Sequence, residues 1–153
     1  MHTNIAEVED LISRNTSVVD FGTAADAVSD EWVGRAEAQL NRTLPPSYKW
    51  FLKNYAGGEI GGEEIYSIYG LPFETVNGGD IVSQHLRGCA TGLHNDSQLT
   101  ISETDFGEVF FFDLNTNNAG EYPIYLRLPS GEQIKYANDF YEFLKKRIVA
   151  HTG

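Results

Sequence analysis

Apolar residues recur every three or four positions in five stretches of the chain, the spacing that places them on one face of a helix. Four of these stretches follow residues that commonly cap helices: Asn4, Ser29 or Asp30, Asp80, and Asn138 or Asp139. We expect the first helix at about 4–14. The other three carry apolar residues as far as Leu40, Cys89 and Ile148.

The fifth stretch, residues 44–58, has the most informative pattern. Pro45-Pro46 suits the start of a helix, where a missing N–H group costs nothing. Gly57-Gly58 predicts its end, because glycine readily adopts the left-handed conformation that follows a helix. An aromatic-rich face lies between these limits and predicts a core helix: Tyr48, Phe51, Leu52 and Tyr55. Trp50 lies off this face, so it packs against a second element or lies at the surface.

Shorter runs rich in β-branched and aromatic residues predict strands at about 64–69, 99–103, 108–114, 124–128 and 132–136. Turn residues at 104–107 and 129–131 join the last four strands into two hairpins. We interpret residues 57–62 as a glycine-rich turn. The segments 15–28, 71–79 and 115–120 are expected to be irregular or loop.

Helices, then strands, then a helix follow one another along the chain. Because hairpins imply antiparallel pairing, this order predicts an α+β fold. We expect one antiparallel sheet of about four to six strands, with the N-terminal helices and the C-terminal helix packed against it. The length of 153 residues favours a single domain spanning 1–153.

Features of membrane and secreted proteins are missing from the sequence. No apolar run is long enough for a membrane span, and the N-terminus lacks a basic segment followed by an apolar one. Cys89 is the single cysteine, so an internal disulfide is excluded and a reducing compartment fits. We therefore expect a cytoplasmic protein with no membrane association.

The acidic charge is concentrated in the middle of the chain. The net charge is −11, which argues against a nucleic-acid partner because such proteins present a basic surface. Residues 54–126 hold eleven acids and only one base, Arg87, so this segment alone carries −10. A segment of this charge fits a basic protein partner.

Residues with catalytic chemistry have simpler interpretations here. Asp80, Ser83 and His85 fall within six positions of one predicted helix and cannot all converge. The acid pairs Glu63-Glu64 and Asp105/Glu108 suit general acid–base chemistry, but any acidic chain offers such pairs. We interpret them as solvated surface and expect no catalytic residues. The glycine-rich turn follows a helix, whereas a phosphate-binding loop opens one.

Candidate metal ligands are few. Asp113, Asn115 and Asn117 begin like a calcium loop, but the flanks read as strands and the later ligand positions do not fit. His85 and His94 suit a metal only with help from carboxylates, and their spacing does not require one. Cys89 is interpreted as a structural thiol. We expect no metal and no cofactor.

A string of motifs in a fixed order gives the chain a family resemblance. It runs from about residue 32 to 148 and comprises Ala36-Glu37 with Leu40, Leu44–Tyr48, Phe51-Leu52, Gly57-Gly58, Ile65–Gly70, Phe106–Asp113, Tyr122–Tyr125 and Phe140–Leu144. In this order the string resembles the SUKH superfamily, which includes yeast cell-wall-synthesis regulators and many bacterial immunity proteins. The resemblance implies an α+β domain without catalytic activity. It implies no particular contact residues, because these vary between members.

Two functions follow from the resemblance. The first is an immunity protein that binds and neutralises a cognate toxin domain, with a basic nuclease as one candidate. The alternative is a regulatory scaffold that binds a cellular protein. We expect a monomer or weak dimer whose contact residues combine acids of the middle segment with an aromatic anchor: Glu59, Glu63, Glu64, Asp105 and Glu108, with Tyr66, Tyr69 or Trp50.

Overall fold

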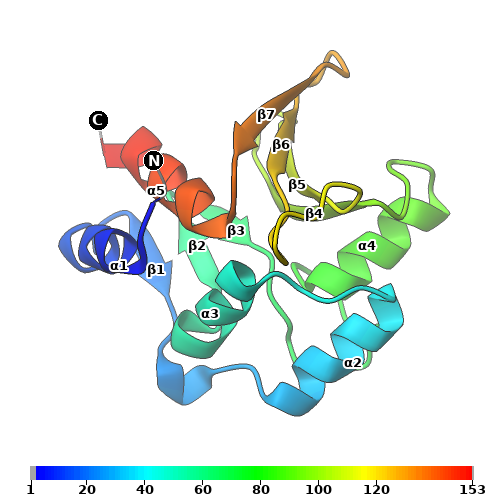
Figure 1. Cartoon of the computed structure of the whole chain (residues 1–153), viewed down its shortest axis with the longest axis horizontal. Coiled ribbons are helices and arrows are strands. Elements are labelled where there is room, and N and C mark those ends of the chain that lie inside the picture. Colours follow the sequence, from blue (N-terminus) through cyan, green and yellow to red (C-terminus); the bar gives the residue numbers. More distant parts are fainter. Residues whose placement is uncertain (1–2, 153) are drawn as a thin grey trace.

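The computed structural model describes residues 3–152 and contains the five helices that the sequence predicts (Figure 1). They are α1 (Ile5–Arg14), α2 (Asp30–Leu40), α3 (Pro46–Tyr55), α4 (Ile81–Ala90) and α5 (Phe140–Thr152). The predicted capping residues are confirmed. Asn4, Ser29 and Asp80 accept hydrogen bonds from main-chain N–H groups of the first turns of α1, α2 and α4. None of the helices among these residues is long and apolar enough to cross a membrane.

The strands are divided between two antiparallel sheets. The first contains β1 (Val19–Phe21), β2 (Gly58–Ile60) and β3 (Glu63–Ile65), in that order. The second contains β4 (Gln98–Glu103), β5 (Val109–Asp113), β6 (Ile124–Arg127) and β7 (Gln133–Ala137), in that order. The predicted α+β class is confirmed, with α5 packed beside the sheets (Figure 1).

The first sheet differs in detail from the sequence prediction. Residues 15–28, expected to be irregular, contain β1 and a short 3₁₀ helix, η1 (Ala24–Asp26). The predicted turn at 57–62 contains β2, so the turn itself shrinks to Gly61-Gly62. The predicted strand at 64–69 ends at Ile65, and Ser67 forms only an isolated bridge with Asp80.

The role predicted for the double glycine is wrong. The residue directly after α3 with a positive φ is Ala56, at +65°, whereas Gly57 has no positive φ and Gly58, at +144°, already belongs to β2. The glycines are instead needed for close approach. A Cβ on Gly57 would lie 2.7 Å from Ser67 Oγ, and one on Gly58 would lie 2.1 Å from the Asp20 carbonyl oxygen. The pair therefore lets β2 pass close to its neighbours.

Aromatic side chains of α3, β5 and α5 form the centre of the core. Tyr48 and Phe51 are fully buried, and the Tyr48 ring lies 6.0 Å from Phe112 and 5.1 Å from Phe140 between centroids. Its hydroxyl donates to the Tyr66 carbonyl at 2.7 Å, so this buried polar group is satisfied. The helix at 46–55 is thus the predicted core helix.

The two sheets are joined where β3 runs past β4. The Tyr66 N–H donates to the Ile101 carbonyl at 2.8 Å, and the Ser102 hydroxyl donates to the Glu64 carbonyl at 2.8 Å. These bonds place the end of β3 beside the end of β4. Acidic residues of both strands therefore lie on one side of the molecule.

Candidate partner-binding surface

Three carboxylates stand in one row across the first sheet. Asp20 of β1 is directly opposite Glu59 of β2, which is directly opposite Glu64 of β3. Residues paired in this way point to the same face of a sheet, and all three are exposed. Their neighbours Val19, Ile60 and Ile65 are buried on the other face. We call Asp20, Glu59 and Glu64 the acidic row.

The acidic row is not neutralised by the protein itself. Within residues 3–152, no lysine, arginine or histidine forms a salt bridge with any of the three carboxylates. Arg87, the single base of segment 54–126, donates instead to the carbonyls of Val76 at 3.1 Å and Gly78 at 3.4 Å. The row therefore presents uncompensated negative charge to a partner.

Tyr69 extends the acidic row with an exposed aromatic ring. Its hydroxyl donates to Glu64 Oε2 at 2.5 Å and accepts from the Gly79 N–H at 2.7 Å. Partial burial and the hydrogen bond to Glu64 raise its pKa to about 12, so the phenol is neutral near pH 7. The side chain is 38% exposed. A fixed, half-exposed ring beside carboxylates suits an interface anchor.

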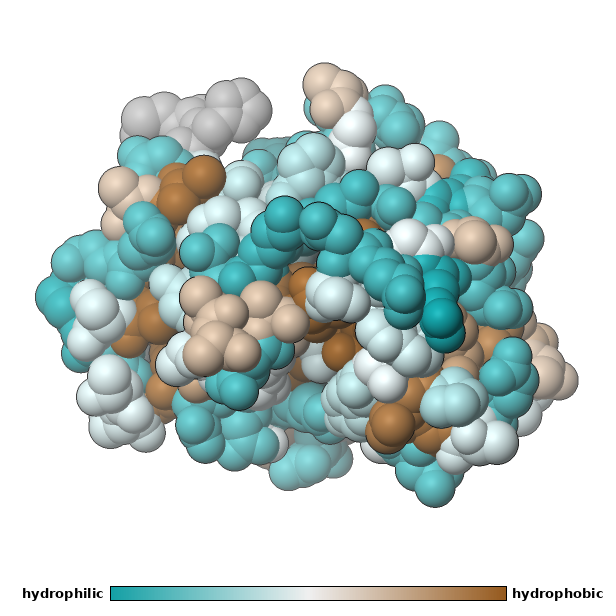
Figure 2. Space-filling model, turned by 90° about the horizontal axis from the view of Figure 1, so that it is seen from below, coloured by the Kyte–Doolittle hydropathy of each residue, from teal (hydrophilic) through white to brown (hydrophobic). Residues whose placement is uncertain are grey.

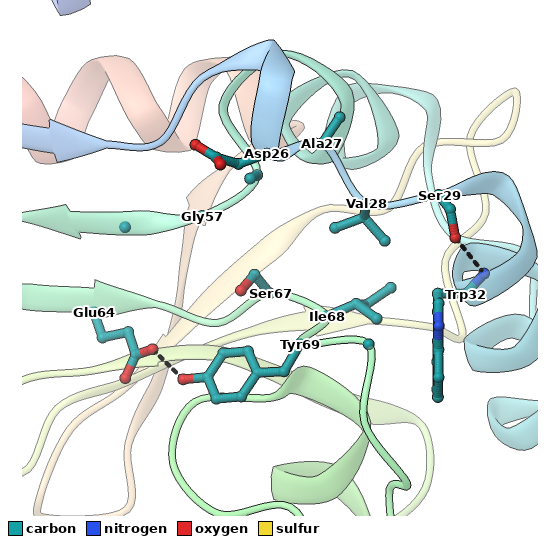
Figure 3. A pocket seen from close by; sticks show the side chains of 13 residues that line it. Asp26, Ala27, Val28, Ser29, Trp32, Gly57, Glu64, Ser67, Ile68 and Tyr69 are labelled. Carbon is teal, nitrogen blue, oxygen red and sulfur yellow. Dashed lines mark hydrogen bonds between the residues drawn. The ribbon is translucent and has the colours of Figure 1, made fainter.

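A pocket of about 470 Å³ opens beside Tyr69 and Glu64 (Figure 3). The segment from Asp26 to Ser29 forms one wall, and the segment from Ser67 to Gly70 forms the other. The Trp32 indole stands at one end, and the carboxylates of Asp26 and Glu64 lie toward the other (Figure 3). Aromatic rings together with carboxylates form an environment that favours a lysine or arginine side chain.

Glu63, the neighbour of Glu64, points away from the acidic row. Its carboxylate forms an ion pair with Arg147 of α5 and lies 3.3 Å from His151 Nε2. The Glu63 and Arg147 side chains are only 15% and 13% exposed. This carboxylate joins β3 to α5, and its ion pair with Arg147 makes it a poor contact for a partner protein.

Tyr66 lies at the edge of the hydrophobic core. The residue is only 8% exposed, and burial, with the charges of Glu103 and Glu64, raises the pKa of its hydroxyl far above the usual value. The hydrogen bond from the Ser102 hydroxyl to the Glu64 carbonyl places Glu103, at the end of β4, near the acidic row. Neither Glu103 nor Asp20 was among the contact residues expected from the sequence.

The family follows from a comparison with known protein families. A family model described as SMI1-KNR4 cell-wall, SUKH_6, matches residues 30–144. The chain belongs to the SUKH family. The match confirms the resemblance seen in the sequence. It includes Glu59, Glu64 and Tyr69 but begins after Asp20, so the acidic row lies partly outside the matched part of this SUKH domain.

Asp105 and Glu108 lie on the turn that follows β4 of the SUKH domain. Asp105 is exposed, whereas Glu108 is half-buried and accepts a hydrogen bond from the Thr104 hydroxyl at 3.2 Å. Between them Phe106 is 82% exposed. The turn combines charge with a protruding aromatic ring, and Phe106 was not among the contact residues expected from the sequence.

Trp50 lies on a different surface of the SUKH domain. Its ring is half-buried against Tyr55 and Tyr141, with centroids 5.5 and 5.3 Å away. It lines a second pocket together with Lys49 and Lys53. Both lysines form ion pairs there, Lys49 with Glu37 and Lys53 with Asp30, and the structure does not bring Trp50 to the acidic row.

Most of the polar groups considered for catalysis form hydrogen bonds that stabilise the fold. Asp80 is fully buried and accepts from the Val82, Ser83 and Tyr69 N–H groups at 2.9–3.0 Å. The Ser83 hydroxyl donates to the Val76 carbonyl at 2.9 Å. In the loop after β5, the Asp113 carboxylate accepts from Asn115 and Thr116, as expected of a loop with tight turns.

Proposed function

We propose that this SUKH domain is a cytoplasmic immunity protein that binds a cognate toxin domain and blocks it without catalysis. The observation that carries the proposal is the acidic row with Tyr69. Opposed like charges destabilise a sheet, so uncompensated carboxylates on three adjacent strands suit a cationic partner that offsets the repulsion. The SUKH family, which includes many immunity proteins, is consistent with this role.

The pocket gives the proposed interface a place for one basic side chain. A lysine or arginine of the toxin enters between the Trp32 and Tyr69 rings, and its charge is received by Glu64 and Asp26. Figure 2 shows the molecule from below, relative to the view of Figure 1. This face is mainly hydrophilic, and its apolar residues form separate patches. The acidic row with Tyr69 favours a polar interface with an aromatic anchor.

The toxin surface proposed here is one that binds phosphates. A nuclease holds its substrate with lysine and arginine, so an acidic inhibitor competes for the same residues. Glu103, Asp105 and Phe106 extend the contact along the end of the second sheet. We leave out Glu63 and Tyr66, because one is paired inside the protein and the other is buried.

The experiment measures binding to, and protection from, the toxin domain encoded beside this gene. A variant that combines Asp20→Lys, Glu59→Lys and Glu64→Lys should weaken binding at least about a hundredfold, because each attraction becomes a repulsion. The matched control reverses three exposed acids elsewhere: Glu9, Glu31 and Glu132. Equal binding by both variants would reject the acidic row, and failure of the natural protein to protect cells would reject the immunity role.

The alternative is a regulatory scaffold that binds a cellular protein. The family description, SMI1-KNR4 cell-wall, is the observation that favours it. Both functions use a protein partner, so the same charge-reversal variants apply. Purification of the natural protein from its own cells distinguishes them, because a scaffold co-purifies with a cellular protein when no toxin is present.

A further inference from the structure

Two histidines and the single cysteine converge at the C-terminal end of α4. His85 and Cys89 are one helical turn apart, and His94 follows in the loop that leads to β4. Cys89 Sγ lies 3.7 Å from His85 Nε2 and 3.7 Å from His94 Nδ1. One ligand atom from each of the three residues lies within 4.8 Å of the others. The proposed function does not use this group.

The distances from the sulfur to the two histidines match those between metal ligands. In a tetrahedral zinc site with usual bond lengths, a cysteine sulfur and a histidine nitrogen lie about 3.5–3.6 Å apart. Both sulfur–nitrogen distances here are within about 0.2 Å of that value. Two imidazoles and a thiolate are also the ligand types that zinc prefers, and three protein ligands leave a fourth position for water or a carboxylate.

Gly88 permits this arrangement. A Cβ at this position would lie 2.1 Å from His94 Nε2, so only glycine lets the His94 ring rest on α4. The ring then stacks on His85, with centroids 5.2 Å apart and an angle of 24° between planes. Glycine within a helix is unfavourable relative to alanine. This unfavourable glycine, Gly88, stands where it allows His94 to approach Cys89.

Hydrogen bonding leaves the group incompletely satisfied. His85 is 5% exposed and turns its Nε2 atom toward Cys89, whereas Nδ1, the other ring nitrogen, has no hydrogen-bond partner among the described residues. Burial and the neighbouring His94 lower the pKa of His85, which favours the neutral imidazole that binds metals. A thiol has one proton, so Cys89 donates to only one of the two rings. A cation would engage His85 Nε2, His94 Nδ1 and the Cys89 sulfur at once.

We propose that His85, Cys89 and His94 bind one zinc-like divalent cation. Burial and the charge of Asp96 raise the pKa of Cys89, so the thiol keeps its proton until a cation displaces it. On binding, Cys89 gives up its thiol proton to solvent. The His94 Nδ1–H, which donates to the Asn95 carbonyl 3.0 Å away, gives up its proton as Nε2 takes one from solvent, so the neutral ring then binds the metal through Nδ1. The ion would fasten the end of α4 to the loop before β4. This replaces the expectation of no metal.

The test uses the whole protein, reduced and stripped of metal, with Zn²⁺ and Co²⁺ as probes. We expect one Zn²⁺ per chain, and Co²⁺ should give the ligand-field bands of a tetrahedral site together with a thiolate-to-cobalt band. Cys89→Ser should abolish the thiolate band. His94→Ala should weaken zinc binding at least about tenfold, since even loss of an outer-shell partner costs that much.

Two further variants separate this site from incidental binding by acidic residues. Gly88→Ala keeps all three ligands but displaces His94, so it should also weaken zinc binding. The control, His151→Gln, removes a histidine outside the group and should leave binding unchanged. Zinc affinity that is equal in Cys89→Ser, His94→Ala and the natural protein would overturn the proposal, as would Co²⁺ spectra without a thiolate band.

Discussion

At the scale of single residues, the opposed carboxylates of the acidic row are the feature whose energetic cost can be measured. Glu59 is the middle member and faces Asp20 on one side and Glu64 on the other. Like charges directly opposite one another are unfavourable by tenths of a kcal/mol to about 1 kcal/mol. The same side chains that bind a partner should therefore weaken the free protein.

Glu59→Gln is expected to stabilise the protein while it weakens binding. The substitution keeps the size of the side chain and removes both repulsions, so the free energy of unfolding should rise by about 0.3–1 kcal/mol at low salt. Salt screens exposed charges, so the gain should shrink as ionic strength rises. Urea denaturation at low and high salt measures this, with Glu132→Gln as a control. A loss of stability in Glu59→Gln would contradict the repulsion.

The contact residues could be predicted from sequence only in part. Glu59, Glu64 and Tyr69 were predicted from charge and residue type, and the structure brings Glu64 and Tyr69 into one hydrogen bond. Asp20 was missed because its place depends on strand pairing across nearly forty positions of the chain. No local pattern carries that information.

At the scale of elements, local chemistry predicted the helices well and the short strands poorly. Helix caps and apolar spacing are local signals, and Asn4, Ser29 and Asp80 act as expected. Strands β1 and β2 have three residues each, too few to show an alternating pattern. Their pairing is set instead by close approach at Gly58 and by burial of one face.

Asp80 connects α4 to the candidate surface, so we expect its loss to disturb both. Its carboxylate caps α4 and also accepts from the Tyr69 N–H at 3.0 Å. Asp80→Ala leaves three buried or half-buried N–H groups without their acceptor and should cost about 2–4 kcal/mol. Urea denaturation measures the loss, and amide exchange at Tyr69 should become faster.

A second cap provides the matched control for Asp80. Ser29 accepts one main-chain bond, from Trp32 at the start of α2, at 3.3 Å. Ser29→Ala should therefore cost only about 1 kcal/mol. It should leave exchange at Tyr69 unchanged. Equal losses in the two variants would show that Asp80 serves only as a helix cap.

At the scale of the whole molecule, the charge is unevenly placed. Residues 54–126 carry −10 of the net −11. Part of this charge is used internally, as in the ion pair of Glu63 with Arg147. Glu59, Glu64 and Glu103 of this segment remain exposed, and Asp20 adds a further charge beside Glu59. An uneven charge of this kind attracts a basic partner over distances longer than the contact itself.

This asymmetry predicts how binding to a basic toxin domain depends on salt. Steering by unpaired surface charges acts on the encounter, so the association rate should fall at least about tenfold between roughly 0.02 and 0.5 M salt. The dissociation rate should change little, because it depends on close contacts such as those of Tyr69. Stopped-flow or surface-binding kinetics measure both rates.

Tyr69→Ala should mainly speed dissociation, whereas Glu59→Gln should mainly slow association and flatten its salt dependence. An association rate that does not respond to salt would contradict electrostatic steering, even if the complex itself were tight.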